Sequence, residues 1–287
     1  MKTAVITTGG LGTRLLTVTK VNPKTMLPLY VKSTDSDLNP FLQPLIEIIF
    51  NNLYDHGFRK FCFIVGKKGQ YSIKNHLIPD PNFLKLLKSR NNPIDKRFIR
   101  MLEKSYKKYS NSEISWITQS TPMGFGHALL SAKKFVGDDN FLLHAGDAYF
   151  PNYDFLTPMI NAFKKSDDTT GSILLQHKKN VEGYGIAQIK RKNHENLVIN
   201  VEEKPKKPKS NLAILPVYLL DKNIFSSLKK ISHGYNGELQ VTDAIKYLLD
   251  NEKKFIANNF SSNWFDIGTV HRYYDALSYS YKESLKI

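Results

Sequence analysis

The sequence predicts an α/β protein with three layers, in which helices cover both faces of a mixed, mostly parallel central sheet. In the first half, short apolar runs typical of strands alternate with longer segments that have helical spacing. In the second half, strand-like runs follow one another with little helix between them. The first pattern favours parallel strands joined by helices, and the second favours antiparallel pairing. The apolar content of 41% is enough for a large core.

The first half is expected to supply four strands and two well-marked helices. The strands are the apolar runs at residues 3–8, 61–65, 114–118 and 141–144. A helix is predicted over 41–56, where Leu45, Ile48, Ile49 and Leu53 recur at helical spacing, and a second over 126–135. The polar and basic stretch 78–109 is expected to form two short helices with breaks near 79–81 and 91–93.

The second half is expected to add antiparallel strands and to end in a helix. Strands are predicted at residues 172–176, 186–190, 198–201, 212–218 and 255–258, and helices at 241–249 and 270–283. No internal repeat or linker divides the chain, so we expect a single domain over 1–287. Its two halves would be about 1–150 and about 151–287, the latter including the C-terminal helix.

Charge and cysteine content restrict the function classes. The formal net charge of +15 favours anionic partners, but the lysines of 85–108 and 204–209 are interpreted as solvated faces. No nucleic-acid-binding motif accompanies them, so no nucleic-acid partner is expected. No apolar run reaches membrane-spanning length, and the first strand leaves no room for a signal peptide. With the single Cys62 in an apolar strand, we expect a cytoplasmic protein and no membrane partner.

The N-terminal segment carries the most informative motif. An apolar strand ends in Gly9-Gly10-Leu11-Gly12-Thr13-Arg14, and Pro23-Lys24-Thr25-Met26-Leu27-Pro28 follows. Glycines let the backbone approach an anion closely, and the basic side chains add positive charge. The segment is neither a P-loop nor a dinucleotide fingerprint. An ordinary strand-to-helix turn with surface cations stays open as an alternative.

Three other polar segments follow predicted strands. Gln119 begins Gln-Ser-Thr-Pro-Met-Gly-Phe-Gly-His, and its side-chain amide could pair with the edge of a pyrimidine. Asp147 ends a buried strand, where ligands of open α/β sheets gather, although for a single Asp a turn or cap residue is the favoured explanation. In Glu202-Glu203-Lys204-Pro205, a lysine at a strand end can reach an anion or belong to a solvated charge cluster.

Taken together, these motifs resemble those of sugar nucleotidyltransferases. Within that family the Gly-Leu-Gly-Thr-Arg and Pro-Lys-x-Met-Leu-Pro pieces look most like the bacterial enzymes that join UTP to glucose 1-phosphate. The resemblance implies a Rossmann-like α/β/α nucleotidyltransferase fold whose first half binds the nucleotide and whose second half binds the sugar phosphate. It also implies that UDP-glucose and pyrophosphate are made by in-line attack on the α-phosphate of UTP.

The resemblance assigns roles to particular residues. The triphosphate would be held by Arg14 and Lys24 with the turn residues Gly9, Gly10, Gly12 and Thr13, and uracil by Gln119 and Gly124. Asp147 and Asp266 would bind Mg²⁺. Lys204 would hold the sugar phosphate, while Glu203 and Gly185 would contact the sugar and Glu238 and Asp243 would lie near it. Arg14, Lys24 and Lys204 are thus the candidate catalytic residues, UTP and a sugar 1-phosphate the partners, and a homo-oligomer is expected.

Three alternatives remain open on the sequence. Thymidylyltransferases share the glycine-rich motif, the glutamine and the aspartates, although Thr19-Lys20 before Pro23-Lys24 and the helical insert before Gln119 favour uridylyl transfer. A non-catalytic subunit would lack the charged set that is present here, and a nucleic-acid-binding protein would be recognised by salt-sensitive retention on DNA. Departures from the family are a polar insert at 32–39, Thr17 in place of proline, and His144-Ala145-Gly146 before Asp147.

Overall fold

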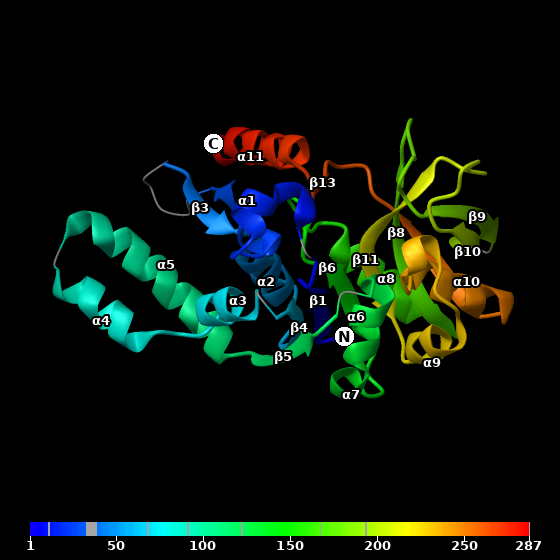
Figure 1. The fold of residues 1–287 in the computed structure, drawn as a ribbon, viewed down its shortest axis with the longest axis horizontal. Helices are drawn as coiled ribbons and strands as arrows, with labels where there is room; N and C mark the ends of the chain where they lie inside the picture. The colour runs from blue at the N-terminus through cyan, green and yellow to red at the C-terminus, as the bar shows by residue number, and fades with distance from the viewer. Residues whose placement is uncertain are drawn as a thin grey trace.

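The fold is described from a computed structural model. It describes residues 1–10, 12–32, 39–67, 69–90, 92–121, 123–166, 168–192 and 194–286, without the side chains of 93–95. Within these ranges, nine strands form one sheet in the order β5-β4-β1-β6-β11-β8-β12-β10-β9. Helices lie on both sides of this sheet (Figure 1). The predicted three-layer arrangement with a mixed sheet is therefore confirmed.

The first half of the chain forms the parallel part of the sheet. Its strands are β1 (Thr3–Thr7), β4 (Lys60–Gly66), β5 (Glu113–Gln119) and β6 (Phe141–Ala145). The strand β1 lies between β4 and β6, and β5 pairs with the outer side of β4, all in parallel. Parallel strands end at the same edge of a sheet, so the turns after β1, β5 and β6 are brought to one side of the molecule.

The second half continues the same sheet with mixed pairing. It contributes β8 (Thr169–His177), β9 (Ile186–Lys192), β10 (Glu195–Glu202), β11 (Leu212–Leu220) and β12 (Lys254–Asn259). The strand β11 pairs antiparallel with β6 and β8, whereas β12 runs parallel to β8. Because β6 and β11 pair directly, the sheet is continuous between the two halves. The division of one domain at about residue 150 stays a prediction.

Two hydrophobic clusters show how the layers pack. One cluster lies between the sheet and the helices α2 (Leu45–Asp55) and α8 (Leu156–Lys165). The other lies under α6 (Phe125–Ser131), α7 (Lys133–Val136), α9 (Asn223–Lys230) and α10 (Val241–Asp250). Alternate residues of β1 enter opposite clusters, Ile6 the first and Val5 the second, as the period of two in a strand requires. Cys62 is buried in the second cluster, and burial raises the pKa of its thiol to about 12.

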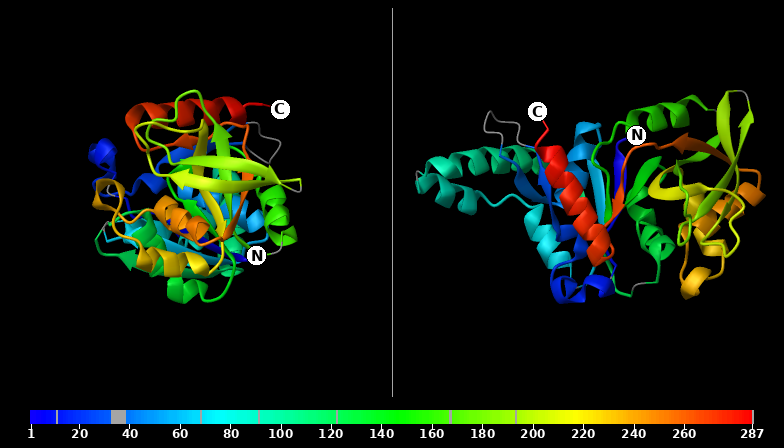
Figure 2. Two further views of the ribbon diagram at one scale, coloured as in Figure 1. Left: turned by 90° about the vertical axis from the view of Figure 1, so that its right-hand side faces the viewer. Right: turned by 90° about the horizontal axis from the view of Figure 1, so that it is seen from above.

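A helical hairpin projects from the edge of the sheet. It consists of α4 (Pro81–Ser89) and α5 (Pro93–Ser110), and α3 (Gln70–His76) precedes it. Figure 1 shows α4 and the far end of α5 away from the sheet, and the right-hand view of Figure 2 agrees. The two helices predicted between residues 78 and 109 are confirmed, with the breaks near the predicted positions, although α5 with its 18 residues is not short.

The predicted helix over 41–56 was wrong at its start. Residues 41–44 form the strand β3 (Phe41–Pro44), which pairs antiparallel with β2 (Pro28–Val31), and the helix begins at Leu45. Pro44 has no N–H group to donate within a helix and stands at the N-cap with extended backbone. Likewise, the single helix expected over 126–135 is divided at Ala132 into α6 and α7.

Several short elements were not predicted. They are the helices α1 (Leu16–Thr19), α3, α8 and α9, the 3₁₀ turns η1 (Thr13–Leu15), η2 (Lys24–Met26) and η3 (Tyr235–Gly237), and the strands β2, β7 (Ala148–Tyr149) and β13 (Phe265–Asp266). The predicted C-terminal helix is α11 (Val270–Ser284). Most of the polar insert at 32–39, namely residues 33–38, lies outside the described residues. Among the described helices, none has the length and apolar character needed to span a bilayer.

Candidate active site

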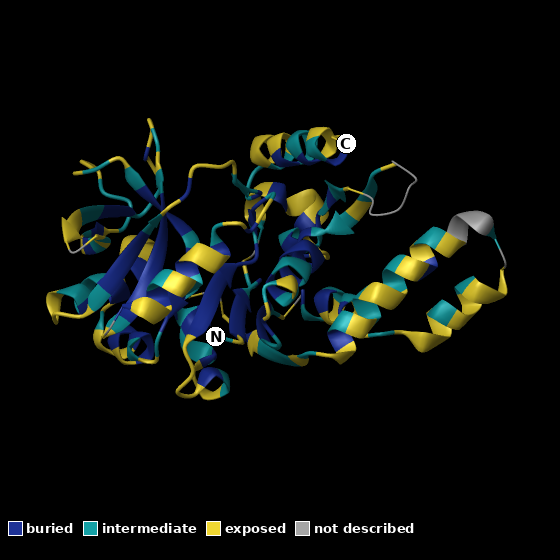
Figure 3. Cartoon of the chain, turned by 180° about the vertical axis from the view of Figure 1, so that it is seen from behind, coloured by how far each residue is buried: buried dark blue, intermediate teal, exposed yellow. Residues whose placement is uncertain are grey.

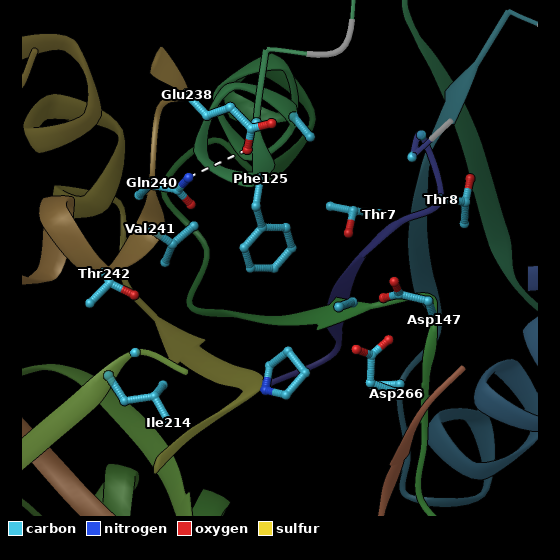
Figure 4. A pocket seen from close by; sticks show the side chains of 18 of the residues that line it. Thr7, Thr8, Phe125, Asp147, Ile214, Glu238, Gln240, Val241, Thr242 and Asp266 are labelled. Carbon is cyan, nitrogen blue, oxygen red and sulfur yellow. Dashed lines mark hydrogen bonds between the residues drawn. The ribbon is translucent and has the colours of Figure 1, made fainter. Parts of the chain in front are cut away.

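A cleft of about 630 Å³ opens where the two halves of the sheet meet. Its wall combines the turns after β1, β5 and β6 with segments that follow β10 and precede β9 and α10. Apart from Arg14, the residues predicted to contact the nucleotide, the metal or the sugar phosphate all line it, namely Gly9, Gly10, Gly12, Thr13, Lys24, Gln119, Gly124, Asp147, Gly185, Glu203, Lys204 and Asp266. Residues far apart in the sequence thus meet in one cavity, part of which is drawn in Figure 4.

The glycine-rich turn is tightly packed against its surroundings. The backbone of Gly12 has φ +63°, and a Cβ atom there would lie 2.9 Å from the side chain of Thr19. The Thr19 hydroxyl donates to the carbonyl oxygen of Gly12 over 2.8 Å. At Gly9 a Cβ would lie 2.8 Å from Oε1 of Gln119. A side chain at Gly12 would therefore be strained and would collide with Thr19, whereas one at Gly9 would displace the end of the Gln119 side chain.

Arg14 is the predicted site residue that does not line the cleft. It lies on η1 with its side chain exposed. Its positive charge nevertheless acts on Lys24, where it opposes the protonated state. Arg14 is therefore near the cleft without being part of its described wall.

Lys24 and Asp147 form an ion pair on the floor of the cleft. The ammonium group of Lys24, on η2, donates to Oδ2 of Asp147, and only 18% of the Lys24 side chain is exposed. Burial by itself lowers the pKa of Lys24, but the carboxylates of Asp147 and Asp266 outweigh it and the pKa lies above its ordinary value. Burial by itself raises the pKa of Asp147, whereas Lys24 holds it below its ordinary value. Both groups are therefore charged near neutral pH.

A two-stranded ladder brings Asp266 beside Asp147. The strand β13 pairs antiparallel with β7, so that Asp266 lies opposite Ala148, and the amide of Ile267 donates to the carbonyl oxygen of Asp147 over 3.1 Å. Figure 4 shows both carboxylates on the same side of the cleft. Asp266 accepts hydrogen bonds from the amide of Gly268 (2.9 Å) and from Nη1 of Arg272 (2.5 Å).

The two aspartates have the donor chemistry for a hard divalent cation. Mg²⁺ is commonly bound through one or two carboxylates, with water and substrate phosphates as the remaining ligands. In the part of the chain that the structure describes, no group of three or more His, Cys, Asp or Glu side chains is arranged for a metal. Two carboxylates are enough for a divalent ion whose other ligands are water and substrate phosphate.

A side-chain amide and a glycine loop form one end of the cleft. Gln119 is buried at the end of β5, and its Nε2 lies 3.0 Å from Nδ1 of His127. Gly124 has φ +99°, and a Cβ there would lie 2.8 Å from the Leu239 carbonyl oxygen. This oxygen also accepts from the amide of Gly126 over 2.8 Å. The loop is thus held against the segment before α10, which leaves Gln119 and Gly124 facing the cavity.

Another part of the cleft wall contains Lys204 and Glu203. The Lys204 ammonium lies 3.3 Å from Oε1 of Glu203 and 4.7 Å from the centre of the Tyr235 ring. Lys204 has φ +43°, a left-handed conformation that costs a non-glycine residue about 1 kcal/mol or more. A Cβ at Gly185 would lie 3.1 Å from both Oε2 of Glu203 and Oγ1 of Thr242. Gly185 therefore leaves open the space between these two oxygens.

Glu238 and Asp243, both predicted to lie near the sugar, differ in their position relative to the cleft. Glu238 lines the cleft and accepts a hydrogen bond from Gln240 over 3.4 Å. Asp243 is not in the described wall, and burial, with the negative charge of Glu203, raises the pKa of its carboxyl. Asp243 therefore lies near Glu203 but outside the described wall.

The residue pattern did not reveal Tyr235, Thr242 and Arg272. The ring of Tyr235 lies against the ammonium group of Lys204, and the hydroxyl of Thr242 lies next to Gly185. Arg272 lines the cleft beside Asp266. Arg272 follows shortly after the motif that includes Asp266, so its position in the sequence was the one available signal. The contact of Tyr235 with Lys204 depends on the turn at η3 and has no local sequence signal.

Residues 3–283 match the family described as "Nucleotidyl transferase". The chain is 31% identical over 287 residues to a UTP–glucose-1-phosphate uridylyltransferase of Mycoplasma pneumoniae, covering 98% of this chain and 92% of that protein. The enzyme of the same name from Bacillus subtilis is 30% identical over 275 residues, covering 93% and 87%.

Solved structures give the same family. The crystal structure of a UDP-glucose pyrophosphorylase complexed with UDP-glucose superimposes with a TM-score of 0.79 at 25% identity, over 99% of both chains. A UTP-bound UGPase from Acinetobacter baumannii gives 0.78 at 25% identity, over 97% of this chain and 93% of that one. The resemblance predicted from the motifs is confirmed, and the chain belongs to the nucleotidyl transferase family.

Proposed function

We propose that this protein is a UTP–glucose-1-phosphate uridylyltransferase (EC 2.7.7.9), which forms UDP-glucose and pyrophosphate from UTP and glucose 1-phosphate. The observation that carries the proposal is the charge arrangement of the cleft. Lys24, Asp147 and Asp266 lie together in one part of it, and Lys204 with Glu203 lies in another. The full-length relatives from Mycoplasma pneumoniae and Bacillus subtilis that carry this name support the choice of substrates.

The protein has to bring two anions together for the reaction. An oxygen of the sugar phosphate attacks the α-phosphorus of UTP in line, and pyrophosphate leaves. At an effective dielectric constant near 20, the repulsion between two unit charges about 4 Å apart is about 4 kcal/mol. Positively charged groups fixed in the cleft offset this repulsion and stabilise the charge that develops on pyrophosphate.

We assign these cationic roles to three residues. Lys24 holds the triphosphate and stabilises the departing pyrophosphate, with Arg14 adding positive charge from the edge of the cleft. Lys204 holds the sugar phosphate, since its ammonium is presented from a constrained backbone and contacts only one carboxylate, that of Glu203, among the described ion pairs. Mg²⁺ on Asp147 and Asp266 would add further positive charge at the reacting phosphates.

The remaining predicted residues would provide recognition. Gln119 pairs with the edge of uracil, and Gly124 lets the base approach the backbone of its loop. The triphosphate lies along the glycine-rich turn and is bound by the backbone amides of Gly9, Gly10, Gly12 and Thr13. In another part of the cleft, Glu203 accepts a hydrogen bond from a sugar hydroxyl, and Gly185 leaves room for the ring.

A panel of substrates tests the proposal. The purified protein is incubated with Mg²⁺, each of UTP, dTTP, ATP and GTP, and each of several sugar 1-phosphates, and pyrophosphate release is measured. We expect UTP with glucose 1-phosphate to react fastest. A preference for dTTP would reassign the protein to the thymidylyltransferases. Absence of pyrophosphate release from every pair would reject the enzymatic function in favour of a non-catalytic subunit.

We also propose that the protein acts in the cytoplasm as a homo-oligomer. The buried, unpaired thiol of Cys62 supports a reducing compartment. Tyr274 and Tyr281 are exposed on α11, which supports a contact with a second copy through this helix. No nucleic-acid partner is included, because the described cleft has the size and polarity of a small-molecule site.

A further inference from the structure

Arg272 holds one of the two carboxylates on the floor of the cleft. It lies in the first turn of α11, where the Thr269 hydroxyl accepts a hydrogen bond from its backbone amide over 3.4 Å. Its Nη1 donates to Oδ2 of Asp266 over 2.5 Å. The side chain also lines the cleft, and none of the roles proposed above involves it.

The floor of the cleft is therefore electrically balanced before any substrate or metal binds. Asp147 has Lys24 as its counter-ion, and Asp266 has Arg272. A divalent cation that binds both carboxylates has to compete with these two cations. Charge-assisted hydrogen bonds of this kind are roughly twice as strong as neutral ones, so the competition is substantial.

Both oxygens of Asp266 are occupied, and they differ in how easily they can be released. Oδ1 accepts from the backbone amide of Gly268 within a tight turn, where even a Cβ on Gly268 would lie 2.8 Å from that oxygen. Oδ2 is held by a long side chain, of which 47% is exposed. Oδ2 is therefore the oxygen that can become available to a metal, once Arg272 moves away.

The surroundings of Arg272 contain a second cation and aromatic side chains of the cleft wall. Its charge lowers the pKa of Lys178, after the larger effect of burial, which places the two cations near one another. The Lys178 ammonium lies 5.2 Å from the centre of the Tyr184 ring and 5.6 Å from that of Trp264. Tyr184 and Trp264 also line the cleft. The guanidinium is thus close to a second cation and to the aromatic wall of the cleft.

We propose that Arg272 is a positioning residue that holds Asp266 as its counter-ion until a divalent cation takes over the carboxylate. Arg272 then sets how tightly the metal binds to the free protein: it keeps the metal site neutral and its affinity low without substrate phosphates. This rests on the proposed function, because it uses the metal site assigned there to Asp147 and Asp266.

The test is a titration with Mn²⁺ alone, in which the free ion is followed by its electron paramagnetic resonance signal. Neither UTP nor sugar phosphate is present. We expect Arg272→Ala to bind Mn²⁺ at least about 10-fold more tightly than the unmodified protein, because one charge-assisted hydrogen bond no longer competes. Arg272→Lys keeps the charge and should bind Mn²⁺ nearly as weakly as the unmodified protein.

Lys282→Ala is the matched control, because it removes one exposed positive charge from the same helix. Its Mn²⁺ affinity should stay within about twofold of the unmodified protein. Equal or weaker Mn²⁺ binding by Arg272→Ala, including no measurable binding by either protein, would overturn the proposal. Loss of structure cannot produce the tighter binding that the proposal expects. Arg272→Ala can fail to bind Mn²⁺ more tightly although the protein forms UDP-glucose. It can also bind Mn²⁺ more tightly although no UDP-glucose is formed, so the two proposals are tested separately.

Discussion

The cleft and the α4–α5 hairpin both contain basic residues, but in very different settings. The hairpin accounts for a large part of the positive charge of the chain, through Lys85, Lys88, Arg90, Lys96, Arg97, Arg100, Lys104, Lys107 and Lys108. Figure 3 shows it largely exposed along its described length. The cleft has few basic residues, and Lys24 among them is mostly buried against a carboxylate. The number of basic residues in a region therefore does not indicate where the candidate active site lies.

Burial explains the difference between the two regions. In the hairpin, Lys88 and Glu103 lie 2.7 Å apart, with 53% and 43% of their side chains exposed. In the cleft the corresponding fractions for Lys24 and Asp147 are 18% and 28%. Water and salt screen the first pair, whereas the second acts in a medium of lower dielectric constant. One charge in the cleft should therefore matter more than several on the hairpin.

Replacement of Lys24 should give the largest effect. We expect Lys24→Ala to lower turnover of UTP and glucose 1-phosphate about 100-fold or more, because removal of one positioned electrostatic group commonly has this effect. The circular dichroism spectrum should stay unchanged. The matched control is Lys85→Ala on the exposed face of α4, which should keep turnover within about twofold. Near-normal turnover of Lys24→Ala would reject its role and remove the contrast between the regions.

An intermediate effect, on the free energy of unfolding, is expected at Glu47, where α3 and α5 contact α2. Glu47 on α2 is buried, and its carboxylate lies 2.7 Å from Nε2 of His76 on α3 and accepts from the Ser105 hydroxyl of α5 over 2.6 Å. We expect Glu47→Gln to lower the free energy of unfolding by about 1–3 kcal/mol at pH 7, measured with urea. The exposed Glu113→Gln serves as control and should change it by less than about 0.5 kcal/mol.

The difference in free energy of unfolding between the unmodified protein and Glu47→Gln should also depend on pH. Burial by itself raises the pKa of Glu47, but the hydrogen bonds from His76, Ser105 and Tyr109 hold it below its ordinary value of 4.5. A carboxyl with a lowered pKa in the folded state adds stability above its unfolded pKa and loses it as the pH falls through the folded value. The difference between the unmodified protein and Glu47→Gln should therefore shrink below about pH 4.5. A difference that grows there would contradict this account.

The smallest effect is expected from the hairpin ion pair itself. Glu103→Gln removes the partner of Lys88 on the solvent side. We expect it to change the free energy of unfolding by less than about 0.5 kcal/mol and to leave turnover unchanged, because exposed ion pairs contribute little. Urea unfolding and the pyrophosphate assay measure both quantities. A loss above about 1 kcal/mol would show that this pair is not screened as its exposure implies.

Much of the fold could be predicted, since regular apolar spacing is a local property. The buried strands β1, β4 and β6 were found within about two residues of their ends, because each is a continuous apolar run. The strands β7 and β13 were not predicted, because two residues cannot show a period. The helix expected from residue 41 failed at Pro44, where pairing of β3 with β2 decided the conformation.

The same distinction applies to the site. The motifs with Gly9, Gln119, Asp147 and Lys204 could be recognised because each is a short contiguous segment with an unusual composition. Whether Arg14 would lie inside the cleft could not be decided in this way, and the structure places it at the edge. The environment of His144 also depends on the fold. It is fully buried, bonded to Tyr153 over 2.9 Å, and burial lowers its pKa to about 4.

The sequence by itself determined which residue types were available for the chemistry and the order along the chain of the nine strands of the central sheet. Only the tertiary structure decided which of them meet. The pairing of β13 with β7 brings Asp266 to Asp147, the turn at η3 brings Tyr235 to Lys204, and the start of α11 brings Arg272 to Asp266. The reason is physical: a local pattern specifies conformation over a few residues, whereas contacts between distant segments depend on how the whole sheet and its helices pack.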